Sequence, residues 1–231
     1  MTTTSHTSAL DAVLSHIDTT LDASVERLFS LLRIPSISTQ PSHAADCRKA
    51  AEWLQADMAS MGLTADIREV RWAAPGHPMV VAHDSTQAGK PHVLFYGHYD
   101  VQPTDPENLW KAPPFEPRLV EEPSGRKVIV ARGASDDKGQ VMTFLEACRA
   151  WKTVHGSIPV QVSVLLEGEE ECGGSNLLPF LQENAAELKA DVALVCDTSM
   201  ADRQTPGITT SLRGMMAEEI IIECASHDLH S

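Results

Sequence analysis

The chain has 231 residues, of which 42% are apolar and 22% are charged, so it can bury one sizeable core, or one core and the start of a second domain. Its formal net charge of −14 makes nucleic acid and anionic membrane surfaces poor partners, because acidic residues outnumber the Lys and Arg that would neutralise phosphates. We therefore expect small molecules and metal cations as partners, with no nucleic acid and no membrane.

Cysteine usage and the N-terminus both predict a cytoplasmic protein. The five cysteines are scattered without a CxxC spacing, and an odd number cannot all pair within one chain. The first eight residues are polar and lack the basic and apolar regions of an export signal, and no stretch approaches 18 uninterrupted apolar residues. We therefore expect a soluble protein in a reducing compartment.

Hydrophobic periodicity predicts two helices at the start of the chain. Apolar residues at spacings of three and four over residues 9–33 give one stripe on a helix that ends before Pro35. A second helix is expected over residues 43–61, with Gly62 as its C-terminal cap.

Strands and helices alternate in the middle of the chain. The expected elements are strands at 64–70, 79–83, 92–96, 117–121 and 127–131, a helix at 138–151, a strand at 160–166, a helix at 175–188 and a strand at 191–196. This order predicts an α/β fold with a mixed, mostly parallel central sheet flanked by helices. The pattern changes after Asp202, so we expect domains at 1–208 and 209–231, the second beginning with strands that include residues 219–224.

Four short acidic or histidine-bearing segments each follow an apolar run. They are GHYD at 97–100, SDDKG at 135–139, EGEEECGG at 167–174 and VCDTS at 195–199. The carboxyl ends of strands in an open α/β sheet converge on one crevice, so these segments can meet around cations. One imidazole and several carboxylates, without thiolate, suit Zn²⁺, Mn²⁺ or Co²⁺ in a hydrolytic centre.

The first two segments each have a functional and a structural interpretation. His98 and Asp100 share one face of an extended chain, so Asp100 can accept a hydrogen bond from the imidazole and fix its metal-binding tautomer. An ordinary histidine at a strand end, followed by a turn, explains GHYD equally well. In SDDKG, Asp137 can simply cap the following helix, whereas Asp136 is free to bridge two cations.

The third and fourth segments place carboxylates directly after predicted buried strands. Mutual repulsion in the run from Glu167 to Glu171 is unfavourable unless a cation or a proton offsets it. One glutamate can then bind metal while its neighbour, with a raised pKa, takes a proton from activated water. The alternatives are a solvated acidic face for the glutamates and a turn-forming role for Asp197. Cys172 and Cys196 are expected to pack in the interior.

The motifs GHYDVQP, RGASDDKGQ, EGEEECGG, VCDTS, LRG and HDLHS occur in this order, with IPSIST after the first helix. This pattern resembles the M20 metallopeptidase family, and within it the carnosinase-like dipeptidase branch. The resemblance covers nearly the whole chain. It implies a zinc-peptidase-like catalytic domain, the start of an α+β lid and dimerisation domain, and a homodimer.

The resemblance also implies a set of metal ligands. His98 would bind one zinc ion, Asp136 would bridge two, Glu171 would bind the other, and Asp197 would act with His98. A cis peptide bond after Asp136 is implied as well.

Three further residues receive catalytic roles from the resemblance. Glu170 would be the general base, because the family places a glutamate pair, one further residue and then glycine, which Glu170 to Gly173 satisfy. Asp100 would orient the metal-binding histidine. His230 would reach the active site of a partner subunit and stabilise an oxyanion, and the alternative is that His227 and His230 are simply exposed.

The implied reaction is hydrolysis of the peptide bond in dipeptides or small peptides. It would use two zinc ions, or Mn²⁺ or Co²⁺, about 3.5 to 4 Å apart, and an activated water. Deacylation of an N-acyl amino acid would use the same metal chemistry with a different pocket. The family takes its last metal ligand from a histidine far downstream in a longer chain, so we expect an N-terminal fragment. An inactive metal-binding piece is therefore the alternative to an enzyme.

Overall fold

A computed structural model describes residues 3–73, 76–202 and 204–222 of the chain. The chain divides into two compact units, Met1–Asp197 and Thr198–Ser231. All the helices and strands described below lie in the first unit. The domain boundary expected between residues 208 and 209 stays a prediction.

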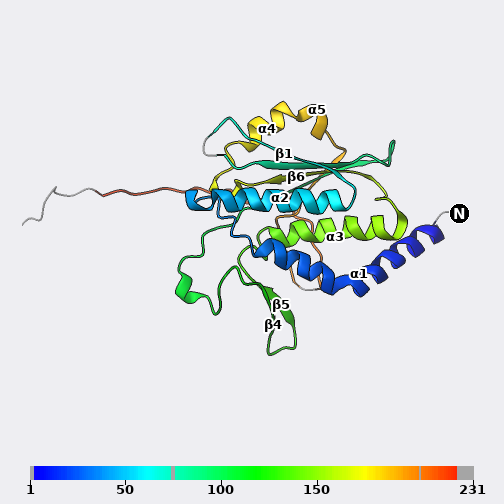
Figure 1. Cartoon of the computed structure of the whole chain (residues 1–231), viewed down its shortest axis with the longest axis horizontal. Helices are drawn as coiled ribbons and strands as arrows, with labels where there is room; N and C mark the ends of the chain where they lie inside the picture. The colour runs from blue at the N-terminus through cyan, green and yellow to red at the C-terminus, as the bar shows by residue number, and fades with distance from the viewer. Residues whose placement is uncertain (1–2, 74–75, 203, 223–231) are drawn as a thin grey trace, which may run out of the picture. The chain divides into compact units, whose positions relative to one another are not determined.

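The first unit alternates strands and helices in the order that the sequence predicts (Figure 1). The helices are α1 (Thr3–Leu32), α2 (Ala44–Ser60), α3 (Lys138–His155), α4 (Leu177–Glu183) and α5 (Ala185–Leu188). The strands are β1 (Thr64–Arg68), β2 (Met79–Asp84), β3 (His92–His98), β4 (Arg118–Glu121), β5 (Lys127–Val130), β6 (Gln161–Glu167) and β7 (Val192–Val195). Short 3₁₀ helices are η1 (Pro41–His43), η2 (Glu107–Leu109) and η3 (Glu170–Cys172).

The central sheet has five strands in the order β1-β2-β6-β3-β7 among the described residues. Strand β2 is antiparallel to both of its neighbours, while β3 pairs in parallel with β6 and with β7. Four of these five strands therefore run in one direction, and the predicted mixed, mostly parallel sheet is confirmed. In this register His98 lies opposite Glu167, so the carboxyl ends of β3 and β6 are level with each other.

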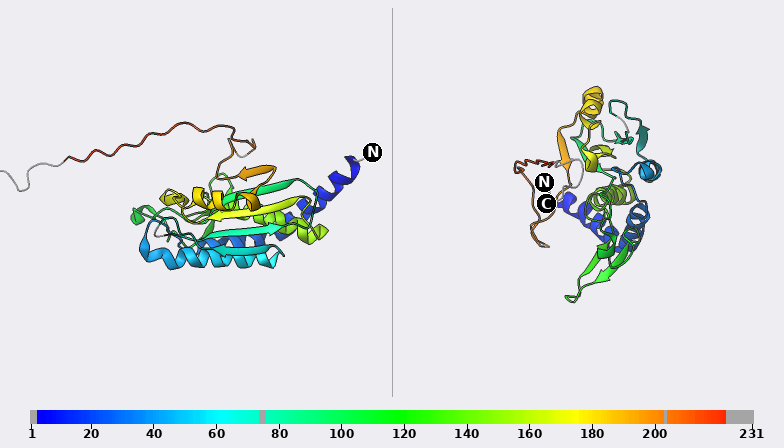
Figure 2. Two further views of the ribbon diagram at one scale, coloured as in Figure 1. Left: turned by 90° about the horizontal axis from the view of Figure 1, so that it is seen from above. Right: turned by 90° about the vertical axis from the view of Figure 1, so that its left-hand side faces the viewer.

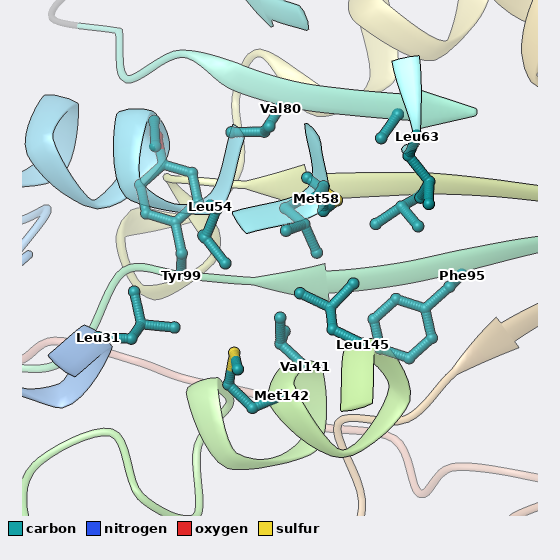
Figure 3. Packing of buried hydrophobic residues seen from close by; sticks show 14 of the residues in the cluster. Leu31, Leu54, Met58, Leu63, Val80, Phe95, Tyr99, Val141, Met142 and Leu145 are labelled. Atoms are coloured by element: carbon teal, nitrogen blue, oxygen red, sulfur yellow. The ribbon is translucent and has the colours of Figure 1, made fainter. Parts of the chain in front are cut away.

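Alternation of side chains along the strands gives the sheet two apolar faces. On one face, Val80 and Phe95 join a core with residues of α2 and α3, and Figure 3 shows side chains from both helices meeting the strands. On the other face, Val81 and Leu165 pack with Phe180 of α4. Figures 1 and 2 accordingly show α1, α2 and α3 on one side of the sheet and α4 and α5 on the other.

Strands β4 and β5 form a separate antiparallel hairpin, which is not part of the central sheet. In Figure 1 this hairpin projects beyond α1 and α3. None of the helices in the described part of the chain, including the 30-residue α1, is long and apolar enough to cross a membrane.

The single helix expected over residues 175–188 is wrong, because two short helices occupy that range. Asn184 separates α4 from α5, and its Nδ2 donates a hydrogen bond of 2.8 Å to the carbonyl of Phe180. A short amide side chain that bonds to the last turn competes with continuation of a helix, which explains the break.

The strands expected at the start of the second domain are also wrong over residues 209–222, because described residues 204–222 contain no helix or strand. A strand needs the hydrogen bonds of a neighbouring strand, and a lone strand pair is at best marginally stable in water. Here Ile220, Ile221 and Ile222 are exposed, so burial of apolar side chains does not stabilise a strand over these residues. Residues 223 and 224 of that prediction lie outside the described residues.

Candidate metal centre

Parallel pairing brings the ends of β3 and β7 to one edge of the sheet, and three candidate ligands meet there. His98 is the last residue of β3, Asp197 follows β7, and Asp136 lies in the loop before α3. A Cβ atom on Gly97 would lie only 2.7 Å from Asp137 Oδ2. Glycine at that position therefore lets the aspartate loop approach the strand closely.

The imidazole of His98 is fully buried and held from both sides. Its Nδ1 donates a hydrogen bond of 3.1 Å to the main-chain oxygen of Asp100, whose Oδ1 lies 3.3 Å away. The predicted bond to the Asp100 carboxylate is thus made to the main chain instead. With Nδ1 oriented this way, Nε2 faces Asp136 Oδ1 at 3.0 Å and Asp197 Oδ2 at 3.4 Å.

The charges around this imidazole are mostly negative. Burial alone would lower the pKa of His98, but the carboxylates of Asp100, Asp137 and Glu170 outweigh it and raise that pKa to about 10. The proton on Nε2 therefore occupies the position in which a divalent cation would be bound by this nitrogen and by one carboxylate oxygen each of Asp136 and Asp197.

The residues present fit a divalent cation. One ligand atom from each of His98, Asp136 and Asp197 lies within 4.8 Å of the other two. Nearby, Asp137 Oδ1 and Glu167 Oε1 are buried and have no hydrogen-bond partner among the described residues. Burial raises the pKa of each of these two carboxyl groups to about 7. Carboxyl groups therefore outnumber cationic groups around His98, and the nitrogen and oxygen donors match the ligands that Zn²⁺, Mn²⁺ and Co²⁺ accept.

Glu171, a predicted ligand, is not brought into this group. Its Oε2 accepts a hydrogen bond of 2.6 Å from Gln102 Nε2, and its main-chain N–H donates to Asp100 Oδ2 at 3.1 Å. Asp100 thus holds both the imidazole and the glutamate loop. Burial, followed by neighbouring carboxylates, raises the pKa of Glu171.

The two glutamates before it are in different situations. Glu169 is buried, with Oε1 accepting from the N–H of His77 at 2.9 Å and Oε2 accepting from Asn176 Nδ2 at 2.8 Å. Glu170 is exposed, and partial desolvation together with Asp100 and other carboxylates raises its pKa while His98 opposes the shift. The first glutamate is a structural anchor, and the second has the exposure and the pKa direction of a general base.

Sequence reasoning missed the part played by Asp137. It stands at the N-cap position of α3, yet its side chain makes no capping bond, so the capping interpretation is wrong. Its Oδ2 instead accepts a hydrogen bond of 3.1 Å from the main-chain N–H of His98. Glu167 was likewise not singled out, and its Oε2 accepts a 2.6 Å hydrogen bond from the Tyr96 hydroxyl. The signal in the sequence was the presence of more than one acidic residue in SDDKG and in EGEEECGG.

The remaining predictions at this site have mixed outcomes. The peptide bond between Asp136 and Asp137 is cis, as the resemblance implied. The interior packing expected of Cys172 is wrong, because this residue is exposed in the turn of η3, which has no buried residues. Cys196 does pack against the core, as expected. His227 and His230 lie outside the described residues.

Comparison with known proteins shows to which family the chain belongs. The profile of the peptidase family M20/M25/M40 matches residues 94–227, a segment that contains all four motifs. The chain belongs to this family. The family predicted from the motifs is therefore confirmed.

Individual relatives cover almost all of this chain. The Cys-Gly metallodipeptidase dug1 of Schizosaccharomyces pombe is 30% identical over 96% of this chain and 48% of its own length. The Beta-Ala-His dipeptidase of Rattus norvegicus is 28% identical over 98% of this chain and 47% of its own. The crystal structure of human carnosine dipeptidase 1 is 26% identical and superposes with a TM-score of 0.72, covering 82% of this chain and 41% of that one. The chain thus spans about half the length of the curated relatives it matches.

Proposed function

We propose that this protein hydrolyses the peptide bond of dipeptides or small peptides in a metal-dependent reaction. The observation that carries the proposal is the meeting of His98, Asp136 and Asp197 at the sheet edge, with the exposed Glu170 on the next loop. The dipeptidase names of the relatives support the substrate class.

His98, Asp136 and Asp197 would hold one ion, and Asp136 has a second oxygen available for another. Glu171 would complete the site for a second ion once its side chain leaves Gln102. A divalent ion held by these residues would lower the pKa of a water molecule and would polarise the scissile carbonyl. Zn²⁺ is the ion we propose, with Mn²⁺ or Co²⁺ as substitutes, because the donors are one nitrogen and several oxygens.

Glu170 is the proposed general base. Its carboxylate would take a proton from the attacking water and later give that proton to the nitrogen of the leaving amine, so the base is regenerated. The raised pKa of Glu170 favours this exchange, because a carboxylate whose pKa lies closer to neutrality both accepts and returns a proton readily. Asp100 would keep the imidazole in its ligating orientation through the bond to Nδ1.

The proposal includes three features that rest on the family resemblance or on composition. They are a homodimer, a lid that begins at residue 209, and a contribution of His230 to the site of the partner subunit. A cytoplasmic setting is supported by the free thiols of the four cysteines within the described residues.

The test is hydrolysis of Cys-Gly and β-Ala-His by the Zn²⁺-loaded protein, compared with Glu170→Gln. We expect the variant to keep its bound metal and to lose activity by a factor of about 10² to 10⁴. The matched control is Glu183→Gln, at an exposed glutamate of α4, which should retain full activity.

Two results would contradict the proposal. One is unchanged turnover in Glu170→Gln at equal metal content. The other is faster hydrolysis of N-acetyl amino acids than of either dipeptide, which would identify a deacylase that uses the same ligands.

A further inference from the structure

Two imidazoles converge on one hydroxyl group at the amino ends of β3 and β6. His83 Nδ1 and His92 Nε2 each lie 2.7 Å from Ser163 Oγ. The register of the sheet explains this meeting, because His83 is directly opposite Ser163 and His92 is opposite Gln161, two residues earlier. All three side chains therefore lie on the face of the sheet that α4 and α5 cover.

The outward nitrogens of both rings are bound to groups that only accept hydrogen bonds. His83 Nε2 lies 2.8 Å from Glu187 Oε1, and His92 Nδ1 lies 3.0 Å from the main-chain oxygen of Lys189. Each outward nitrogen must therefore carry a hydrogen, which leaves a lone pair on each inward nitrogen in the neutral rings. Ser163 has a single hydroxyl hydrogen and can satisfy only one of these two lone pairs.

The hydrogen bonds of the two outward nitrogens are those that metal-binding histidines usually make. Histidines that bind metal usually donate their other ring N–H to a carboxylate or a main-chain carbonyl, which fixes the tautomer and orients the ring. Glu187 and Lys189 play these two parts here. The inward nitrogens are no farther apart than twice their distance to the hydroxyl, so both can reach one ion with small side-chain rotations.

The site is open to ions and to water. A cavity of about 390 Å³ is lined by His83, His92, Ser163 and Glu187, together with Thr64 and Asp84. His92 and His98 lie at opposite ends of β3, about 20 Å apart at the rise of a strand. The cavity is therefore separate from the metal centre at the other end of the sheet.

We propose that His83 and His92 bind a divalent transition-metal ion such as Zn²⁺ or Ni²⁺, with the Ser163 hydroxyl and water as further ligands. Imidazole suits these ions, and the ion takes the place of the proton that the second inward nitrogen otherwise needs. The charged groups around the pair are Glu187 with its partner Arg68, Asp84 with its partner Lys152, and Asp191, which accepts from the N–H of His92. This site is independent of the proposed peptidase activity.

The experiment measures Ni²⁺ and Zn²⁺ binding to the full 231-residue chain by equilibrium dialysis, in an Asp136→Asn background that weakens the metal centre. We expect about one equivalent of ion per chain. Adding His83→Gln or His92→Gln should weaken that binding at least about tenfold, and Glu187→Gln should weaken it about tenfold through the orientation of His83. Ser163→Ala removes one proposed ligand but keeps both nitrogens, and water can replace the hydroxyl, so the ion should stay bound with a smaller loss of affinity than in either histidine variant.

The matched control is His155→Gln, which removes an exposed imidazole of α3 that also contacts a main-chain oxygen. It should leave binding unchanged. Thermal unfolding of each variant shows that the fold is intact, and His98→Gln replaces the Asp136→Asn background if that variant does not fold. The proposal is overturned if the background chain binds no ion, if both cluster variants bind like their parent, or if His155→Gln loses as much affinity as they do.

Discussion

The two ends of β3 place histidines in opposite surroundings. At the carboxyl end, His98 sits among carboxylates, and the buried Asp137 Oδ1 nearby has no hydrogen-bond partner in the described part of the chain. At the amino end, all four ring nitrogens of His83 and His92 have partners. One added proton satisfies every ring nitrogen at the amino end. At the carboxyl end, a protonated His98 is still surrounded by a larger number of carboxyl groups. A cation should therefore matter most for the carboxyl end.

The largest expected effect is on metal binding at the carboxyl end. Asp136→Asn removes the carboxylate that lies nearest to His98 Nε2, and we expect the affinity of the centre for Zn²⁺ to fall by well over 100-fold. Loss of a mere hydrogen-bonding partner of a ligand typically costs about 10- to 100-fold. Isothermal titration with Zn²⁺ measures the change, and an affinity like that of the parent would remove Asp136 from the ligand set.

The next effect concerns the stability of the metal-free chain as a function of pH. Burial raises the folded-state pKa of Asp137 from 3.8 to about 7. A group with a raised folded pKa contributes stability that is fully present below the unfolded value and is lost as pH rises through the folded value. The metal-free chain should therefore lose stability between about pH 4 and pH 7.

Asp137→Asn should remove much of this loss of stability. Its effect on the unfolding free energy, relative to the parent chain, should be more favourable at pH 8 than at pH 4 by about 2 to 4 kcal/mol. Urea unfolding across this pH range measures it, and Asp11→Asn, at an exposed aspartate of α1, is the control. A pH profile that is the same in Asp137→Asn and in the parent would contradict this account of the carboxyl end.

The position of the metal centre in the sheet could largely be predicted from the sequence, because it depends on where each candidate ligand lies relative to the end of a strand. The ends of the apolar runs place His98 and Asp197 at one sheet edge without any knowledge of side-chain rotamers. What could not be predicted depends on rotamers and on contacts between distant segments. Examples are the anchoring of Glu169 by Asn176, the turn of Glu171 toward Gln102, and the meeting of His83 with His92.

The same distinction holds for the secondary structure. Periodicity located the strands of the first unit, and it works best for a strand such as β6, which is almost wholly buried. The burial expected of the strand before Asp197 is wrong, because all four residues of β7, at the end of the sheet order, are exposed. Periodicity failed beyond residue 209, where an apolar pattern has no neighbouring strand among the described residues, and at Asn184, where one side-chain hydrogen bond divides a helix.

A smaller effect is expected at Lys138, which adjoins the aspartate pair. Its buried ammonium group donates hydrogen bonds to the carbonyl of Leu31, in the last turn of α1, at 3.2 Å and to that of Ile34, just after the helix, at 2.8 Å. Lys138→Met removes both of these hydrogen bonds, so the unfolding free energy at pH 6 should fall by about 1 to 3 kcal/mol.

Burial lowers the pKa of Lys138 to about 7, so its folded-state charge is lost near neutrality while the unfolded chain stays protonated up to about pH 10.5. Stability of the parent should therefore rise from pH 7 to pH 10 relative to Lys138→Met. Chemical unfolding at several pH values measures both effects, with Lys49→Met, at an exposed lysine of α2, as the control. Equal stability of parent and Lys138→Met at every pH would show that this lysine does not anchor the loop.

The smallest effect is expected at Cys172, next to the predicted ligand Glu171. Its side chain is exposed, so Cys172→Ser should change the unfolding free energy by less than about 0.5 kcal/mol and leave Zn²⁺ content unchanged. Thermal unfolding and metal analysis check this. A loss of metal would show that the Cys172 thiol is itself a ligand, and the assignment of Glu171 as the ligand from this loop would then have to be revised.

The most direct test of the metal centre is the anomalous scattering of Zn²⁺ in crystals of the protein. We predict a Zn²⁺ ion in contact with His98 Nε2 and the carboxylates of Asp136 and Asp197, at about 2.0 to 2.2 Å from each ligand atom. Crystals in which Zn²⁺ occupies other residues, and leaves this edge of the sheet without an ion, would contradict the account.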